Sequence, residues 1–411
     1  MRIAICGGRL IDPARSADEK KDLFLAEGRI VAAGAAPLGF SPDRTIDAAG
    51  LMVAPGLVDV GARLAPPGKP ARGVRDFLRK AVEGGITSVA ILPDVFSPLD
   101  NPDAILALAE EARHASLASL FCLGAFTQGL EGKRISDFVR LREAGAAGFS
   151  QASLPLASDA VLLAGARYAA TFGYRLFWEP LGASMAPHGV AHEGKLAARL
   201  GLSGIPAVAE AAEAARMLLL ARETGARLHL LGVSAKSTLD VLEAFAGPVA
   251  SAGVDIHHLF ASEEDALDFD TRFRLILPLR REEDRKALQA WDFPVVSSGH
   301  TEVLPEEKDA PFAEAAPGDA GFAYLLPGIL AWAEEKKVPL ARALARVTSN
   351  PGALLGIETR LDAGARADVV IFDPHCRFQA PPEAGVLAGK RLLGKVVMTL
   401  AGGRVAHEAS P

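Results

Sequence analysis

The segment PAVAEAAEAARMLLLARETGARLHLL, residues 206–231, predicts a helix that leads directly into a short strand. Pro206 suits the first turn of a helix, alanine and leucine fill the following turns, and Gly225 ends it. Arg227–Leu231 is then short and largely apolar, which is typical of a strand buried in a parallel sheet. A helix followed at once by such a strand is part of a repeating βα pattern.

The same alternation extends to both sides, from Leu51 to about Gly356. Eight short strands separated by helical segments, over roughly 300 residues, predict a (β/α)8 barrel of the TIM type. The predicted strands are Val53–Val60, Thr87–Leu92, Ser119–Leu123, Ala147–Phe149, Arg175–Trp178, Arg227–Leu231, Gly253–Ile256 and Pro294–Ser297.

Both ends of the chain predict strands instead of βα repeats. DLFLAEGRIVAAG, residues 22–34, reads as a hairpin that turns at Glu27-Gly28, and ADVVIFDP and LLGKVVMTLAGGRVAHE follow Leu361. We therefore expect one small β-sandwich built from both termini. The predicted divisions are residues 1–52 for its N-terminal part, 53–361 for the barrel and 362–411 for its C-terminal part.

The composition argues against a nucleic-acid partner, a membrane partner and a paired-cysteine metal site. The 411 residues carry a net charge of -6 without a run of lysine or arginine, so no nucleic-acid partner is expected. No apolar stretch reaches the roughly 18 residues of a spanning helix, so no membrane partner is expected either. Cys6, Cys122 and Cys376 lie far apart, which suits a reducing cytoplasm and excludes a paired-cysteine metal site.

The loop after the first barrel strand has the setting of an active site without its chemistry. In APGLVDVGARLAPPG, residues 54–68, an apolar strand enters a loop rich in glycine and proline, where barrel enzymes usually place catalytic groups. However, Gly61, Ala62 and Arg63 offer no group that could hold a metal, accept a proton or attack a carbonyl.

Seven segments, in order over nearly the whole chain, resemble dihydroorotases of the amidohydrolase superfamily. They are APGLVDV (54–60), GGITSVAILPD (84–94), the stretch from GLSGIP to SAKST (201–238), HHLFAS (257–262), LPLRREEDRKAL (277–288), VTSNPGALLGI (347–357) and GARADVVIFDP (364–374). The resemblance implies a barrel with two zinc ions at the carboxyl ends of its strands, where zinc activates a bridging water and polarises an amide carbonyl.

At each position where the resemblance implies a metal ligand or catalytic acid, this sequence has another residue type. The family's His-x-His aligns with Gly61 and Arg63, and its acidic pair aligns with Gln151 and Ala152. The remaining ligand or catalytic positions align with Trp178, Gly232 and Gly299. The positions that bind substrate in the family align with Ala65, Asp94 and Ile276. We therefore expect a vestigial site with no catalytic residue, no zinc and no other cofactor.

Several histidines and charged residues near these positions allow more than one interpretation. His229, His257, His258 and His300 could form a relocated metal site, or they could be framework histidines that pack between strands. Arg63 could bind a small anion together with His300, or it could pair with a nearby carboxylate, such as Asp59 or Asp94, and fill the vacated site. Trp178 is expected to fill volume left by the metals. Glu179, Glu193 and Asp255 are acids without an evident partner.

The resemblance extends to function through non-catalytic members of the family. Some bacteria contain inert dihydroorotase homologues that associate with aspartate carbamoyltransferase, and this chain resembles that branch. We expect a catalytically inactive, cytoplasmic subunit of a mixed oligomer with that transferase. The alternatives are an active cyclic amidohydrolase with a rearranged site and a module that senses a small anion.

Overall fold

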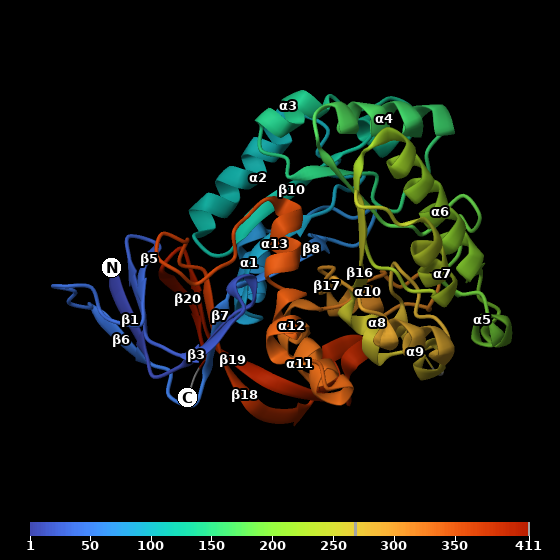
Figure 1. Ribbon diagram of the computed structural model, residues 1–411. Coiled ribbons are helices and arrows are strands. Elements are labelled where there is room, and N and C mark those ends of the chain that lie inside the picture. The colour runs from blue at the N-terminus through green and yellow to red at the C-terminus, as the bar shows by residue number, and fades with distance from the viewer. Residues whose placement is uncertain (267–268, 410–411) are drawn as a thin grey trace.

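The computed structural model describes residues 1–266 and 269–409 and confirms the predicted barrel (Figure 1). Eight parallel strands pair in chain order. They are β8 (Leu57–Ala62), β9 (Ile86–Ile91), β10 (Ser119–Ala125), β11 (Gly148–Ser150), β12 (Arg175–Trp178), β15 (Arg227–Leu230), β16 (Ala250–Asp255) and β17 (Val295–Ser297).

The last strand meets the first at a polar seam. A parallel bridge joins Arg63 to Thr301, with the Arg63 amide donating to the His300 carbonyl at 3.0 Å. The buried Asp59 carboxylate accepts bonds from the amide and the hydroxyl of Ser298, both at 2.6 Å. Burial raises the pKa of Asp59, although the two Ser298 bonds favour its charged form. This seam places the residues that follow β8 and β17 next to each other at the barrel mouth.

Helices cover the outside of the barrel. The helix predicted from residue 206 is α6 (Ala207–Thr224), with Pro206 before its first turn and Gly225 in the left-handed conformation after its last. The other helices are α1 (Val74–Glu83), α2 (Pro102–Ala115), α3 (Phe138–Glu143), α4 (Asp159–Thr171), α5 (Lys195–Leu200), α7 (Lys236–Phe245), α8 (Ile256–Phe260), α9 (Glu282–Ala290), α10 (Pro305–Lys308), α11 (Leu325–Lys336), α12 (Leu340–Ala345) and α13 (Ser349–Leu355). None of the described helices is long and apolar enough to cross a bilayer.

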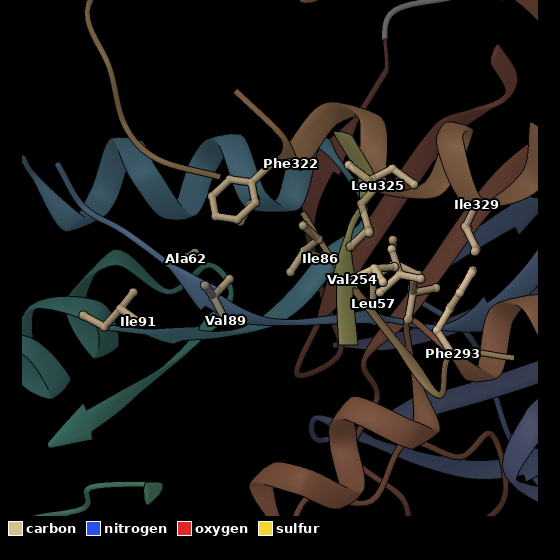
Figure 2. Packing of buried hydrophobic residues seen from close by; sticks show 14 of the residues in the cluster. Leu57, Ala62, Ile86, Val89, Ile91, Val254, Phe293, Phe322, Leu325 and Ile329 are labelled. Carbon is tan, nitrogen blue, oxygen red and sulfur yellow. The ribbon is translucent and has the colours of Figure 1, made fainter. Parts of the chain in front are cut away.

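Two apolar layers hold the barrel together because side chains alternate between the faces of each strand. Val58, Val60, Leu123, Phe177 and Val295 form the inner layer. The outer layer joins strands to helices, and Figure 2 shows part of it, where Leu57, Ile86 and Val89 lie among Phe322, Leu325 and Ile329. Whether a side chain on a barrel strand points inward or outward therefore follows from its position in this alternation.

Two smaller sheets lie together at one end of the molecule, one built from N-terminal strands alone and the other from strands of both termini (Figure 1). One sheet has the order β5-β4-β1-β6 and the other β20-β19-β18-β7-β2-β3. A buried cluster that includes Ile3, Leu25 and Ile371 packs residues from both termini together. The strands are β1 (Arg2–Cys6), β2 (Arg9–Asp12), β3 (Ala17–Lys20), β4 (Leu23–Ala26), β5 (Arg29–Ala33), β6 (Arg44–Asp47), β7 (Met52–Pro55), β18 (Val369–Gln379), β19 (Arg391–Ala401) and β20 (Arg404–Glu408), with β13 (Ala191–His192) and β14 (Gly204–Ile205) forming a separate pair.

The single strand predicted at Val53–Val60 is two strands in the structure. β7 pairs with β18 in the terminal sheet, and β8 begins the barrel. Gly56 lies between them, where a Cβ would lie 2.2 Å from the Thr87 hydroxyl oxygen. The close approach of the neighbouring strand therefore requires glycine at the point where the chain changes sheets.

Candidate functional site

The carboxyl ends of the barrel strands surround a very small polar cavity. Its volume is about 30 Å³, which is room for one or two water molecules. The polar side chains that line it lie at or just after the ends of four strands. They are Arg63 (β8), Glu179 (β12), Asp255, His257 and His258 (β16) and Thr301 (β17), and Gly61 and Gly299 also line it. The space at the end of the barrel is therefore largely filled by the protein's own side chains.

A buried ion pair crosses the mouth above this cavity. Arg63, which follows β8, donates from Nη2 to the Glu179 carboxylate, which follows β12. The two side chains are only 4% and 7% exposed. Ser153 also donates its hydroxyl to Glu179, so the carboxylate has two donors in place of solvent. Such a pair keeps both charges satisfied inside the protein.

The prediction that Arg63 pairs with a carboxylate is confirmed, but the partner is neither Asp59 nor Asp94. The Asp59 carboxylate is engaged by Ser298 at the barrel seam. Asp94 accepts the backbone amide of Phe96 in its own loop and that of Gly68 in the loop after β8. The partner is Glu179 because a residue two positions after the inward-facing Phe177 shares its face of the strand.

Trp178 does not fill the metal position, which corrects the expectation from sequence. Its indole Nε1 donates to Glu213 on α6 at 2.8 Å, and its ring packs edge-on against Phe126 with centroids 5.5 Å apart. The side chain therefore points outward to the helix layer. Phe177, one residue earlier, occupies the inward position of this strand.

The three glycines at the vestigial positions have backbones and surroundings that disfavour larger residues. Gly61, Gly232 and Gly299 have φ values of 94°, 59° and 63°, which L-residues rarely adopt. A Cβ at Gly232 would lie 2.0 Å from Cδ1 of Leu277, and one at Gly299 would lie 2.9 Å from Nδ1 of His257. A histidine or aspartate at these positions would require the surrounding chain to move.

Gln151 is buried, and both ends of its side-chain amide form hydrogen bonds to neighbouring residues. Its Oε1 accepts the Thr127 hydroxyl at 2.8 Å, and its Nε2 donates to the Leu130 carbonyl at 2.9 Å. These bonds connect the end of β11 to the loop that follows β10. Ala152, the next residue, lines a larger cavity above the mouth.

The four histidines considered as a relocated metal site have separate partners. His229 contacts the Ser251 hydroxyl at 2.8 Å, and burial lowers its pKa to about 3. His257 lies 3.3 Å from an Asp319 oxygen, and His258 donates from Nε2 to the Pro278 carbonyl at 3.3 Å. Within residues 1–266 and 269–409, no three histidine, cysteine, aspartate or glutamate side chains are grouped to hold a metal.

His300 does not join Arg63 in an anion site, contrary to that interpretation of the sequence. Its Nε2 lies 3.2 Å from the Glu302 carboxylate, and its ring stacks on Phe322 with centroids 3.8 Å apart. The side chain is 3% exposed and is buried against Phe77 as well. It therefore belongs to the packing between the mouth and α1.

Asp255 is an acid in the small cavity whose importance could not be seen from the sequence. It lies at the end of β16, against Gly232 and Gly299. Burial, together with the nearby carboxylates of Glu179 and Asp59, raises its pKa to about 7. Asp255 is therefore a group at the mouth whose charge changes near neutral pH.

A larger cavity of about 470 Å³ opens above the ion pair. Its walls are mainly apolar, and Arg63, Asp94, Arg274 and Ile276 contribute to its lining. Arg274 donates to the Val190 and Leu275 carbonyls, and burial lowers its pKa to about 10. Ala65, the other vestigial substrate position, lines a separate space of about 20 Å³ below it.

Comparison with known proteins relates this chain to one family. A family model described as dihydro-orotase-like matches residues 50–238. A dihydroorotase-like protein of Pseudomonas aeruginosa is 35% identical, covering 99% of this chain and 100% of that protein. A dihydroorotase of Syntrophotalea carbinolica is 31% identical over the full length of both chains. The L-hydantoinase of Arthrobacter aurescens shares the fold, with a TM-score of 0.83 at 22% identity, covering 100% of this chain and 96% of that one.

Proposed function

Because this chain belongs to the dihydroorotase-like family of the amidohydrolase superfamily, we propose that it is a member without zinc-dependent hydrolysis. In this proposal it serves in the cytoplasm as a non-catalytic subunit of a complex with aspartate carbamoyltransferase. One observation carries the proposal: the Arg63–Glu179 pair occupies the barrel mouth where the family resemblance implies metal. A barrel of this size offers a large rigid surface for a partner whether or not it catalyses a reaction.

The residues of the mouth do not fit a pair of zinc ions. Zinc needs lone pairs from imidazole, carboxylate or thiolate groups, and Gly61, Gly232 and Gly299 have no such group. The Arg63 guanidinium has no lone pair to donate and carries a positive charge into the same space. Its charge also satisfies Glu179, an acid that would otherwise be free to coordinate a cation.

Metal analysis together with an activity assay tests the loss of hydrolysis. The purified chain should contain far less than one zinc ion per molecule after incubation with excess zinc and desalting. It should show no turnover of dihydroorotate or hydantoin above a denatured-protein blank. Near-stoichiometric zinc with measurable turnover would instead support the alternative of an active hydrolase with a rearranged site.

Co-expression with the aspartate carbamoyltransferase of the same organism tests the partnership. The two proteins should elute as one particle of constant stoichiometry in size-exclusion chromatography. Separating them should change the assembly or the activity of the transferase. Independent elution with unchanged transferase kinetics would contradict the assignment.

The cavity of about 470 Å³ supports ligand binding as a second candidate function. Its size is that of a small-molecule pocket, and Arg274 brings a positive charge to its wall. Arg63 contributes less to anion binding than sequence suggested, because Glu179 already engages its charge. Thermal-shift measurements with pyrimidine-pathway intermediates separate the two functions, since a ligand of the native state raises the melting temperature.

A further inference from the structure

Three arginines from separate parts of the chain line another cavity, which lies away from the barrel mouth. This cavity has a volume of about 370 Å³ and lies where β5, β20 and the segment after α2 come together (Figure 1). Arg29 begins β5, Arg404 begins β20, and Arg366 lies between the last helices and β18. Ser116 and Leu117 close the opposite side, and Glu27 is the only acid in the described lining.

Two of these arginines are direct cross-strand neighbours. Arg29 and Arg366 face each other across an antiparallel bridge, flanked by the bonds from Ile30 to Ala365 and from Ala367 to Gly28. This pattern is the non-hydrogen-bonded type of pair, in which facing side chains are closest. Like charges directly opposite each other destabilise a sheet. The register therefore places two arginines directly opposite each other, an arrangement that opposes pairing unless another group offsets their charges.

The neighbouring acids compensate only part of this charge. Arg366 pairs with Asp368 at 2.8 Å, and Asp368 also accepts the Gly402 amide. Arg29 donates to the neutral Gly364 carbonyl at 2.8 Å. In residues 1–266 and 269–409, no carboxylate pairs with Arg29 or Arg404. Positive charge is left over at the cavity.

Backbone contacts hold together the three segments that carry these arginines. The turn at Gly402-Gly403 lies directly against the turn at Gly28, where a Cβ on Gly403 would come within 2.9 Å of the Gly28 Cα. The Gly403 amide donates to the Ala367 carbonyl at 2.9 Å. The segments that carry Arg29, Arg366 and Arg404 are thus hydrogen-bonded to one another, which is a pre-organised arrangement for a ligand.

We propose that this cavity binds a soluble phosphate-bearing metabolite, whose phosphate is held by the guanidinium groups of Arg29, Arg366 and Arg404. The planar guanidinium matches phosphate oxygens with paired N–H donors, and a dianion removes the repulsion between Arg29 and Arg366. Both of these arginines also line a neighbouring cavity of about 270 Å³, so space for the rest of the molecule lies beside them. The proposal does not depend on the transferase complex.

Thermal unfolding and calorimetric titration of the full chain test this site with inorganic phosphate and pyrophosphate. We expect a saturable rise of the melting temperature that sodium chloride at equal ionic strength does not produce. Arg29→Gln and Arg404→Gln should each weaken binding about tenfold or more, since each removes a charged hydrogen-bond donor. Arg222→Gln is the matched control, because Arg222 is an exposed arginine in the last turn of α6, outside both cavities.

A measurement without phosphate shows whether the variants fold. Arg29→Gln should then melt at or above the temperature of the parent chain, because it removes a like-charge neighbour of Arg366. The proposal is overturned if the parent chain shows no saturable response beyond that of chloride. It is also overturned if the double variant Arg29→Gln, Arg404→Gln responds as strongly as Arg222→Gln.

Discussion

Replacing Arg63 with methionine tests whether the ion pair at the barrel mouth is an integral part of the fold. The substitution keeps an unbranched side chain but leaves the Glu179 carboxylate buried, with the Ser153 hydroxyl as its remaining donor. Breaking a buried pair by removing one partner typically costs about 3–5 kcal/mol. We therefore expect Arg63→Met to lower the free energy of unfolding by about 3–5 kcal/mol.

The double variant separates the value of the pair from the penalty of an unpaired charge. With Arg63→Met and Glu179→Leu together, no charge is left buried at this position. Replacing a buried pair with apolar residues of similar volume is often neutral or stabilising. The double variant should therefore recover most of the stability lost in Arg63→Met, which gives a coupling energy well above 1 kcal/mol.

Urea unfolding followed by tryptophan fluorescence measures these differences, because Trp178, Trp291 and Trp332 all lie in the barrel. Arg9→Met is the control, since it breaks a pair with Asp18 whose side chains are 53% and 38% exposed. Exposed pairs contribute about 0–1 kcal/mol. If Arg63→Met costs no more than Arg9→Met, the ion pair does not support the mouth and the reasoning is refuted.

The remaining predictions concern the titration of two buried groups, the packing of Trp178 and the return of an acid to position 299. Since the pKa of Asp255 is raised to about 7 by burial, the free energy of unfolding should decrease as the pH rises from about 4 to 7. Urea titrations should show that Asp255→Asn removes this decrease. Burial lowers the pKa of His229 to about 3, so this residue should destabilise the fold as the pH falls from about 6.5 towards 3, which acid unfolding of His229→Gln can check. Trp178→Phe should lower stability by about 1–3 kcal/mol in thermal unfolding, because it removes the bond to Glu213 and contacts in the outer layer, without altering metal content. Gly299→Asp, which restores the family's residue type, should lower the melting temperature and bind no zinc by elemental analysis, because of its φ of 63° and the nearby His257.

The barrel could be predicted because its signals are local. The signals that predict each βα repeat lie within about thirty residues of sequence. For α6 and β15 they are Pro206 before the helix, Gly225 after it and the apolar strand that follows. The division of residues 52–62 into β7 and β8 could not be read in this way. It depends on Thr87, which the barrel brings against Gly56 from the next strand.

Which of these positions cannot ligate a metal could be read from the sequence, because glycine and arginine side chains have no lone pair to donate wherever they lie in the fold. The partner of Arg63 was not visible, since Glu179 is 116 residues away and Asp59 and Asp94 are nearer in the chain. One signal was available. Phe177 faces inward in the strand that ends at Trp178, and Glu179 follows two positions later, so continued alternation past the strand end places Glu179 on the inward side.

The ion pair between Arg63 and Glu179 has a physical consequence for the fold. The Glu179 carboxylate at the barrel mouth, and Asp255 once it ionises near neutral pH, are stabilised by a positive charge nearby. A bound metal supplies that charge only while its ligands are deprotonated and the ion is available. Arg63 supplies it as part of the chain, at any metal concentration and at any pH that the folded protein encounters. A barrel stabilised in this way keeps its shape without a dissociable ion.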